Sequence, residues 1–256
     1  MTRALDWPAQ QIEQACASDL PGLRFEAMAQ VDSSNSELMR RARNGQTQAV
    51  LLLAEQQSAG RGRLGRQWSS DLAFSLGLPL SPLDWSGLSL VVGLSIVQSL
   101  HPDLRLKWPN DVWWRGRKLA GILIETASFG SSRYVVIGVG INIRPLDGTG
   151  LPTPPAWLQE LLPDLDVRQA LLKIAPALLQ TIKTFERSGF APFQAGFHRR
   201  DALHNVQVML SNGTVGIAQG VDPSGALLLG TANGMISVTS AEVSVRPLDA
   251  STGKPS

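Results

Sequence analysis

The chain of 256 residues is long enough for one large domain, or for a large domain with a smaller one appended. Apolar residues make up 43% of it and charged residues 17%, which predicts a soluble globular protein with a sizeable core. Its 23 basic residues nearly balance 21 acidic ones, and a net charge of +2 argues against a general affinity for nucleic acid.

The first 30 residues predict one short helix and one strand from scattered apolar positions such as Ile12 and Phe25. They are too few for a three-helix DNA-binding module, and they lack the pattern of a signal peptide. Cys16 is the only cysteine, which excludes an internal disulfide and a cysteine-based zinc site and fits a reducing compartment. No apolar run is long enough to span a bilayer. We therefore expect a cytoplasmic protein with no membrane association.

Small polar residues open a helical pattern at Ser33-Ser34-Asn35, ahead of Leu38 and Met39. Serine and asparagine cap helix N-termini, because their side chains accept hydrogen bonds from the free backbone N–H groups. A helix N-terminus also suits an anionic or carbonyl ligand. Both interpretations are open for these residues taken alone.

A loop rich in glycine and arginine follows a predicted strand over 49–54, and it reads Gly60-Arg61-Gly62-Arg63-Leu64-Gly65-Arg66-Gln67-Trp68. Glycine lets the backbone approach a ligand closely, and arginine supplies permanent charge with donors suited to phosphate or carboxylate. We expect this loop to be mobile when empty and ordered by an anion.

Other interpretations of this loop are weaker. Residues 60–65 fit the G-x-G-x-x-G pattern of dinucleotide-binding folds, but no helical pattern follows them, as that site requires. No Gly-Lys-Ser/Thr follows either, which excludes a Walker A loop. RNA-binding Arg-Gly segments usually repeat, whereas this segment occurs once. A solvated basic loop is the remaining alternative if the segment is considered alone.

The region up to residue 203 alternates strand and helix patterns. We predict strands at 73–78, 104–108 and 134–143, a hairpin over 112–125, and helices at 84–100, 167–187 and 191–200. Four prolines between 145 and 155 indicate a loop over 146–156. From residue 205 the pattern changes to short β-type runs separated by Gly- and Asn-containing turns, which predicts a small barrel of about 45 residues.

Three further motifs follow the loop in order: Lys107-Trp108-Pro109-Asn110-Asp111, then 118–125 (KLAGILIE), then 138–143 (GVGINI). Together with Ser33-Ser34-Asn35 and the Gln57 to Trp68 stretch, they resemble the biotin protein ligases. The resemblance implies an α/β (α+β) catalytic domain with a mixed β-sheet, like that of class II aminoacyl-tRNA synthetases and biotin ligases, followed by an SH3-like barrel. We place the catalytic domain at 1–203, the barrel at 204–248 and a frayed tail at 249–256.

The implied activity is ATP-dependent joining of biotin to AMP with release of pyrophosphate, followed by transfer of biotin to a lysine of a biotin carboxyl carrier protein. No side-chain nucleophile is needed, since catalysis of this kind depends on positioning two anions and on stabilising charge. Mg²⁺ is implied together with ATP, with no metal-binding residue assigned. We expect no DNA binding and no repressor activity, and either a monomer or a homodimer.

The resemblance also assigns residues. The implied catalytic residues are Lys107, Arg61 and Arg63. Contacts to biotin are implied for Ser33, Ser34, Asn35, Gln57, Arg61, Gly62, Arg63, Lys107, Gly121, Gly138 and Gly140. Contacts to ATP are implied for Arg63, Trp68, Asn110, Lys118, Asn142 and Trp157.

Several of these assignments have structural alternatives. Asn110 and Asp111 either hold a turn or help to place Mg²⁺ and phosphates. Asn142 either contacts phosphate or metal, or caps a strand end. Trp157 either stacks on adenine or packs in the core.

Two other functions compete with biotin ligation. Lipoate ligases share the general fold and adenylation chemistry, but they lack this form of the arginine–glycine loop and the Lys-Trp-Pro-Asn motif. A biotin-dependent regulatory or nucleic-acid-binding protein is disfavoured by the near-neutral charge.

Overall fold

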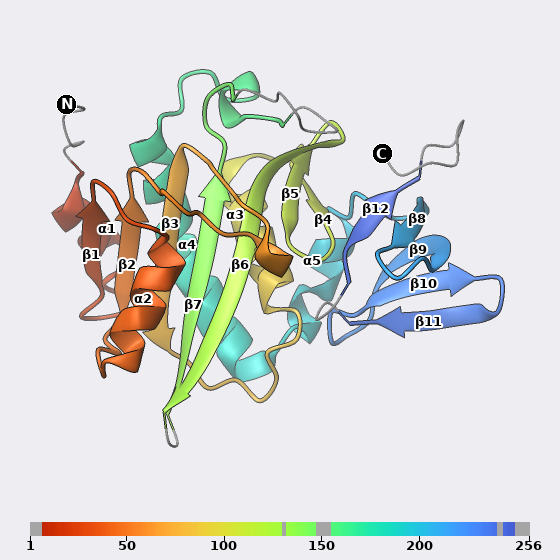
Figure 1. The fold of residues 1–256 in the computed structure, drawn as a ribbon, viewed down its shortest axis with the longest axis horizontal. Coiled ribbons are helices and arrows are strands. Elements are labelled where there is room, and N and C mark those ends of the chain that lie inside the picture. The colour runs from red at the N-terminus through yellow and green to blue at the C-terminus, as the bar shows by residue number, and fades with distance from the viewer. Residues whose placement is uncertain (1–6, 130–131, 147–154, 240–242, 249–256) are drawn as a thin grey trace.

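A computed structural model describes residues 7–129, 132–146, 155–239 and 243–248. It contains a seven-stranded mixed sheet with helices on both faces, and a five-stranded antiparallel sheet formed by the C-terminal part of the chain (Figure 1). The predicted α/β fold with a small β unit after it is therefore confirmed. Most of the predicted loop over 146–156 and the predicted tail at 249–256 lie outside the described residues.

The large sheet has the strand order β1-β2-β3-β7-β6-β5-β4. Strands β1 and β2 are parallel and all other neighbours are antiparallel. The strands are β1 (Arg24–Met28), β2 (Val50–Ala54), β3 (Leu72–Pro79), β4 (Arg105–Lys107), β5 (Asp111–Trp114), β6 (Arg117–Phe129) and β7 (Ser132–Ile141). Strand β3 lies inside the sheet between β2 and β7 and is buried along nearly its whole length, which explains its largely apolar sequence.

Helices cover the two faces of this sheet unequally. Helix α2 (Ser34–Arg43) packs alone against one face, over β2, β3 and β7 (Figure 1). On the other face lie α1 (Ala9–Cys16), α3 (Leu88–Leu100) and α4 (Val167–Ser188), which pack into the main hydrophobic core with the strands. Helix α4 begins with a capping box between Asp166 and Gln169.

Helix α3 begins later than predicted. Its N-terminal boundary lies at Leu88 and not near Asp84 or Ser86, because Asp84 accepts a hydrogen bond from the backbone N–H of Ser86 in a preceding turn. Gly87 then takes a left-handed conformation with φ 78°. The predicted helix at 191–200 is a 3₁₀ turn over Ala191–Phe193 followed by the short α5 (Gln194–His198).

The C-terminal sheet has the order β11-β10-β9-β8-β12. Its strands are β8 (Gln207–Leu210), β9 (Val215–Val221), β10 (Leu227–Thr231), β11 (Gly234–Val238) and β12 (Val245–Pro247). It is attached to the large domain by a hydrogen bond from Trp108 Nε1 to the carbonyl of Gly225 (3.0 Å). Backbone pairing of Leu106 with Arg200 and Ala202 holds the segment that leads into it. Among the described helices, none is both long and apolar enough to cross a membrane.

Candidate active site

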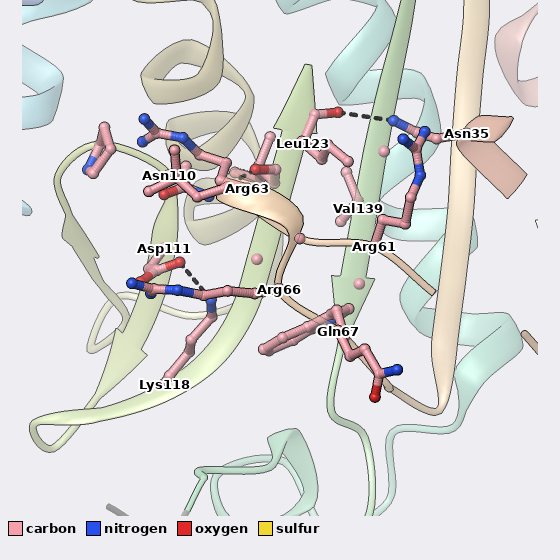
Figure 2. Close-up of a pocket in the computed structure, with 18 of the residues that line it drawn as sticks. Asn35, Arg61, Arg63, Arg66, Gln67, Asn110, Asp111, Lys118, Leu123 and Val139 are labelled. Carbon is pink, nitrogen blue, oxygen red and sulfur yellow. Dashed lines mark hydrogen bonds and ion pairs between the residues drawn. The ribbon is translucent and has the colours of Figure 1, made fainter. Parts of the chain in front are cut away.

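A cavity of about 410 Å³ lies on the side of the sheet that α2 covers, beside the first turn of that helix. The glycine–arginine loop and residues of strands β3 to β7 form much of the rest of its wall (Figure 2). Residues of the last strand β12 also line it. Most predicted site residues line it: Ser33, Ser34, Asn35, Gln57, Arg61, Gly62, Arg63, Trp68, Lys107, Asn110, Lys118, Gly121, Gly138 and Gly140. Residues from six sequence segments are thus brought to one place.

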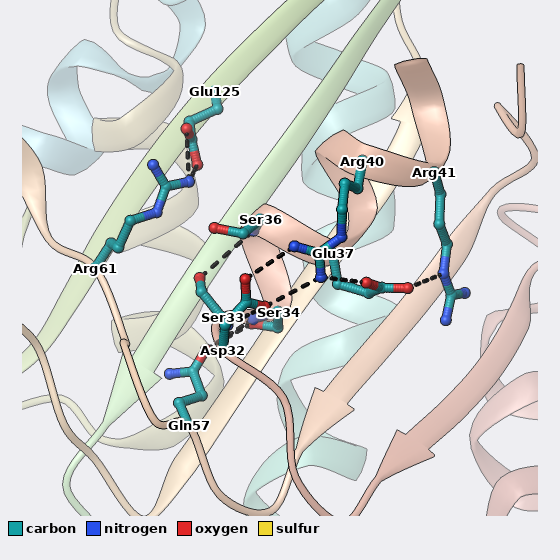
Figure 3. Close-up of polar contacts among 10 residues, drawn as sticks. All are labelled: Asp32, Ser33, Ser34, Ser36, Glu37, Arg40, Arg41, Gln57, Arg61 and Glu125. Carbon is teal, nitrogen blue, oxygen red and sulfur yellow. Dashed lines mark hydrogen bonds and ion pairs between the residues drawn. The ribbon is translucent and has the colours of Figure 1, made fainter. Parts of the chain in front are cut away.

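The first turn of α2 supplies a polar end of the cavity. Ser33 caps the helix, since its Oγ accepts from the backbone N–H of Ser36 at 3.5 Å (Figure 3). Gln57 Oε1 accepts from the backbone N–H of Ser34 at 2.8 Å. Ser33 therefore caps the helix and also lines the cavity, so the two interpretations of this turn do not exclude each other.

A buried hydrogen-bond network continues from this turn into the sheet. Ser75 Oγ lies 2.7 Å from Ser34 Oγ and 2.6 Å from Asn35 Oδ1. Asn35 Nδ2 donates to Glu125 Oε2 (2.9 Å), and Glu125 also binds the guanidinium of Arg61 at 2.7 Å (Figure 3). Helix α2, strand β3, strand β6 and the glycine–arginine loop are thereby linked through side chains.

Sequence reasoning did not assign Ser75 or Glu125. Ser75 is the one hydroxyl residue in an apolar strand, and that is a signal the sequence carries. Glu125 ends the 118–125 motif, but nothing in that motif indicates that it pairs with the loop.

Ion pairs on the outer side of α2 hold the turn that precedes it (Figure 3). Arg40 binds Asp32 at 2.8 Å, and Asp32 also accepts from the backbone N–H of Ser33. The hydrogen bond from Arg40 holds the pKa of Asp32 below its usual value. Because this pair is largely exposed, we expect it to contribute less than about 1 kcal/mol.

The glycine–arginine loop closes on itself. Gly62 N donates to Arg66 O at 2.7 Å, and Trp68 N donates to Gly60 O at 2.9 Å. A Cβ on Gly60 would lie 2.2 Å from the Trp68 carbonyl oxygen, so only glycine permits this closure. The loop contains a single 3₁₀ turn and leads into β3 with no helix between them, which excludes the dinucleotide-binding interpretation.

Three glycines of the cavity wall make room for protein side chains. A Cβ on Gly138 would lie 2.2 Å from Asn35 Oδ1, and one on Gly140 would lie 2.0 Å from the indole nitrogen of Trp68. At Gly121 the nearest atom is Lys118 Nζ, at 3.2 Å. The close contacts at these three glycines are made by side chains of the site itself.

The other end of the cavity is cationic. Lys107 is only 8% exposed, and its Nζ lies 3.7 Å from Asp111 Oδ2. Lys118 Nζ lies 2.7 Å from the other oxygen of the same carboxylate (Figure 2). Burial lowers the pKa of Lys107, and the charges of Lys118 and Arg66 lower it further, while Asp111 opposes the shift. Burial also lowers the pKa of Arg63. Among the described lining residues Asp111 is the only carboxylate facing these four cations, so this end favours an anion.

Trp68 lies between the two ends of the cavity. Lys118 Nζ sits 4.3 Å from the centre of its ring, a distance suited to a cation–π contact. Its indole N–H is buried and donates to no acceptor within the described part of the chain. An unpaired buried donor at the cavity wall would be satisfied by a ligand acceptor.

Two predicted site residues do not reach the cavity. Asn142 is buried, and its Nδ2 donates to the carbonyl of Ala156 at 3.0 Å. The ring of Trp157 lies 5.7 Å from the guanidinium of Arg117, which itself pairs with Glu160. These contacts fix the segment from residue 155 onwards against β6.

The C-terminal segment contributes to the wall, which the sequence did not indicate. Residues 244–247 line the cavity, and Arg63 reaches the carbonyl of Val243 (3.4 Å). A second cavity of about 280 Å³ shares Arg66, Ser244 and Arg246 with the first. The small domain therefore completes the cationic end.

Comparisons with known families agree with this arrangement. Residues 28–142 match the biotin/lipoate A/B protein ligase family. Residues 205–246 match the biotin protein ligase C terminal domain.

Individual relatives cover most of the chain. It is 35% identical over 227 residues to the bifunctional ligase/repressor BirA of Escherichia coli (strain K12), a match spanning 82% of this chain and 70% of BirA. It is 34% identical over 236 residues to a biotin--[acetyl-CoA-carboxylase] ligase of Paracoccus denitrificans, over 84% of this chain and 98% of that protein. The solved structure of the biotin protein ligase from Aquifex aeolicus in complex with biotin and ATP has a TM-score of 0.73 at 27% identity, over 87% of this chain and 98% of the other.

Proposed function

The chain belongs to the biotin protein ligase family, and on that premise we propose that it activates biotin with ATP to biotinoyl-5'-AMP, releasing pyrophosphate, and then transfers biotin to a lysine of a biotin carboxyl carrier protein. One observation supports this most directly. A single cavity joins a hydrogen-bonding end built for a neutral polar ring to a cationic end built for anions. Biotin has both characters, since it carries a ureido ring and a carboxylate.

The first step requires a carboxylate to attack the α-phosphate of ATP although both are anionic. We assign Lys107 to lie between them. Two opposite charges about 4 Å apart gain ~1 kcal/mol in water and ~4 kcal/mol near a protein surface. Burial strengthens this attraction and also lowers the pKa of Lys107, and among the described residues that line the cavity Asp111 is the only carboxylate to offset its charge.

We assign the first turn of α2 and Gln57 to the ureido ring. Ser33, Ser34 and Gln57 present hydroxyl and amide groups at this end of the cavity. Between the two ends the wall is apolar, with Phe74, Ile122 and Val139 among its residues, which suits a hydrocarbon chain.

ATP would occupy the cationic end, with Arg63, Lys118 and Arg66 facing its phosphates. Mg²⁺ would enter with it. Within the described residues no three His, Cys, Asp or Glu side chains are grouped to hold a resident metal. This fits Mg²⁺, which is commonly held by substrate phosphates, water and one or two carboxylates, and here Asp111 would supply the carboxylate. When bound, the ion neutralises phosphate charge.

The loop and the small domain would exclude water from the mixed anhydride. Arg63 connects the loop to Val243 before β12, so both lie over the same part of the cavity. The second step is attack by a carrier-protein lysine, which needs the carrier to dock at the mouth of the cavity. We expect the enzyme to act as a monomer or a homodimer and not to bind operator DNA, since its acidic and basic residues nearly balance.

Pyrophosphate exchange into ATP tests the first step, run with biotin, with lipoate and with neither. Exchange with biotin alone is the expected result, and labelled biotin should then pass to a carrier protein. Exchange with lipoate alone would reassign the substrate within the matched family. No exchange with either acid, from folded protein, would refute the proposed activity.

A further inference from the structure

Ser75 is a buried hydroxyl residue at the centre of the site that no substrate contact accounts for. It is 0% exposed, it lies in β3, and it does not line the cavity. Its Oγ is nevertheless within hydrogen-bond distance of both Ser34 and Asn35, which do line it. A hydroxyl has one hydrogen, so Ser75 can donate to only one of these two residues.

The direction of the hydrogen bond between Ser75 and Asn35 follows from the orientation of the Asn35 amide. Nδ2 faces two acceptors, Glu125 Oε2 at 2.9 Å and the carbonyl of Leu123 at 3.3 Å (Figure 2). The amide oxygen must therefore be the atom that faces Ser75 at 2.6 Å. An amide oxygen can only accept, so the hydrogen of Ser75 is committed to Asn35.

The direction of the hydrogen bond between Ser34 and Ser75 follows from the first one. The two serine oxygens are 2.7 Å apart, and with the Ser75 hydrogen already used, Ser34 must donate to Ser75. Gln57 Oε1, 3.2 Å from Ser34 Oγ, does not need this hydrogen because it already accepts the Ser34 backbone N–H at 2.8 Å. Toward the cavity Ser34 Oγ can then offer only lone pairs.

Two neighbouring groups are hydrogen-bond donors toward the cavity. Gln57 Nε2 remains a donor, because Oε1 is fixed on the Ser34 N–H. Ser33 Oγ accepts the capping N–H of Ser36, so its hydroxyl hydrogen is left for a ligand. The polar end of the cavity therefore presents one acceptor beside two donors.

We propose that Ser75 is a positioning residue that fixes this pattern, and that the pattern selects a cyclic urea, which offers N–H groups to the acceptor and a carbonyl oxygen to the donors. A dithiolane ring offers neither, so the same pattern disfavours lipoate. This inference rests on the proposed function and specifies how its substrate is distinguished.

Substituting Ser75→Ala releases the Ser34 hydrogen, which can then turn toward Gln57 or into the cavity. The biotin concentration for half-maximal pyrophosphate exchange should rise about tenfold, the factor that corresponds to about 1.4 kcal/mol, within the range for an unpaired buried polar group. The rate at saturating biotin should change less than about twofold, since the cationic end is untouched. Ser75→Cys keeps a weak donor and should give an intermediate value.

The matched control is Ser95→Ala. Ser95 is also buried, at 2% exposure, but it lies in α3 and its hydroxyl has no partner among the described residues, so its removal should leave the biotin requirement unchanged. A double-mutant cycle adds a readout that a general loss of stability would not reproduce. Because Ser75 acts through Ser34, the effect of Ser75→Ala should fall below about twofold in a Ser34→Ala background.

The outcomes distinguish failure of the Ser75 positioning role from failure of the proposed function. Equal effects of Ser75→Ala in both backgrounds, or an effect matched by Ser95→Ala, would overturn the positioning role and leave the ligase function intact. Biotin-dependent exchange by the wild-type protein with an unchanged biotin requirement in Ser75→Ala would do the same. Absence of biotin-dependent exchange in the wild-type protein would overturn both.

Discussion

Gly138→Ala is the substitution that most directly tests the packing of the site. The added methyl group would lie 2.2 Å from Asn35 Oδ1, 2.8 Å from its Cγ and 3.0 Å from its Nδ2. These distances are far below van der Waals contact, so Asn35 must move. Gly138 pairs with Ser75 across β3 and β7, which places the clash at the centre of the buried network.

The cost can be estimated from what Asn35 would lose. Moving its amide gives up the bond from Ser75 and the bond to Leu123, at about 1 kcal/mol each, and the bond to the charged Glu125, at about 1.5–3 kcal/mol. Smaller shifts of Asn35 and of the backbone that keep these bonds cost about 1–3 kcal/mol in strain. The protein takes the cheaper route, so we expect a loss of about 1–3 kcal/mol, or roughly 2–12 °C in Tm for a chain of this size.

Thermal unfolding of Gly138→Ala, with the biotin dependence of pyrophosphate exchange, measures this effect. Gly230→Ala is the control: Gly230 also lies in a strand, and a Cβ there would meet only the Ile217 carbonyl oxygen at 3.6 Å and Met235 Cε at 3.9 Å. That control should be neutral or more stable by about 0.5–1 kcal/mol. Adding Asn35→Ala to Gly138→Ala should recover part of the stability because it removes the clash. If Gly138→Ala is as stable as Gly230→Ala, the packing argument is wrong.

Four predictions concern the cationic end. Lys107→Ala should lower the rate of adenylate formation by about 100-fold, which is the usual effect of removing one charge-stabilising donor. Its free energy of unfolding should change by less than about 1 kcal/mol. Full activity or an unfolded variant would count against the assignment. The rate of pyrophosphate exchange should fall at alkaline pH, with an inflection below the ordinary lysine pKa of about 10.4, because burial lowers the pKa of Lys107. Lys107→Arg should move this alkaline fall to higher pH, because arginine stays charged. The lowered pKa also means that the unfolded chain binds this proton more tightly than the folded chain does. The free energy of unfolding should therefore rise with pH between the folded and unfolded pKa values of Lys107. This rise should be absent in Lys107→Met. Arg63→Gly should release biotinoyl-AMP about tenfold more readily in quenched reactions, because it removes the link from the loop to Val243; unchanged release would refute the trapping role.

The sequence was sufficient for the fold because local patterns and tertiary structure agree. The apolar alternation and turn residues around 112–125 predict the hairpin of β5 and β6, and the long amphipathic pattern from 167 predicts α4. Boundaries were less certain where local hydrogen bonds compete with helix formation. At Asp84 the side chain stabilises a turn, and α3 begins only at Leu88.

The site was predictable where the motif residues themselves meet, and less so where other segments support them. Ser75 has the sequence context of a core strand, and only the register of β3 against β7 brings it to Asn35. Arg246 is far along the chain from the loop it faces. The resemblance assigned Trp157 to the nucleotide, and in the structure its ring lies beside the guanidinium of Arg117. Such relations depend on long-range geometry, which single-sequence patterns do not encode.

Cys16 illustrates why the chemistry does not require a nucleophilic side chain. It is fully buried in the core, and burial together with the charge of Asp19 raises the pKa of its thiol to about 11, so it stays protonated and unreactive at neutral pH. The groups that the cavity offers are instead fixed donors, fixed lone pairs and cations around Asp111. A ligand that is neutral and hydrogen-bonding at one end and anionic at the other satisfies both ends at once. Neither end alone would distinguish biotin from other carboxylic acids or from other cyclic ureas, and the two ends together favour a substrate that carries both groups.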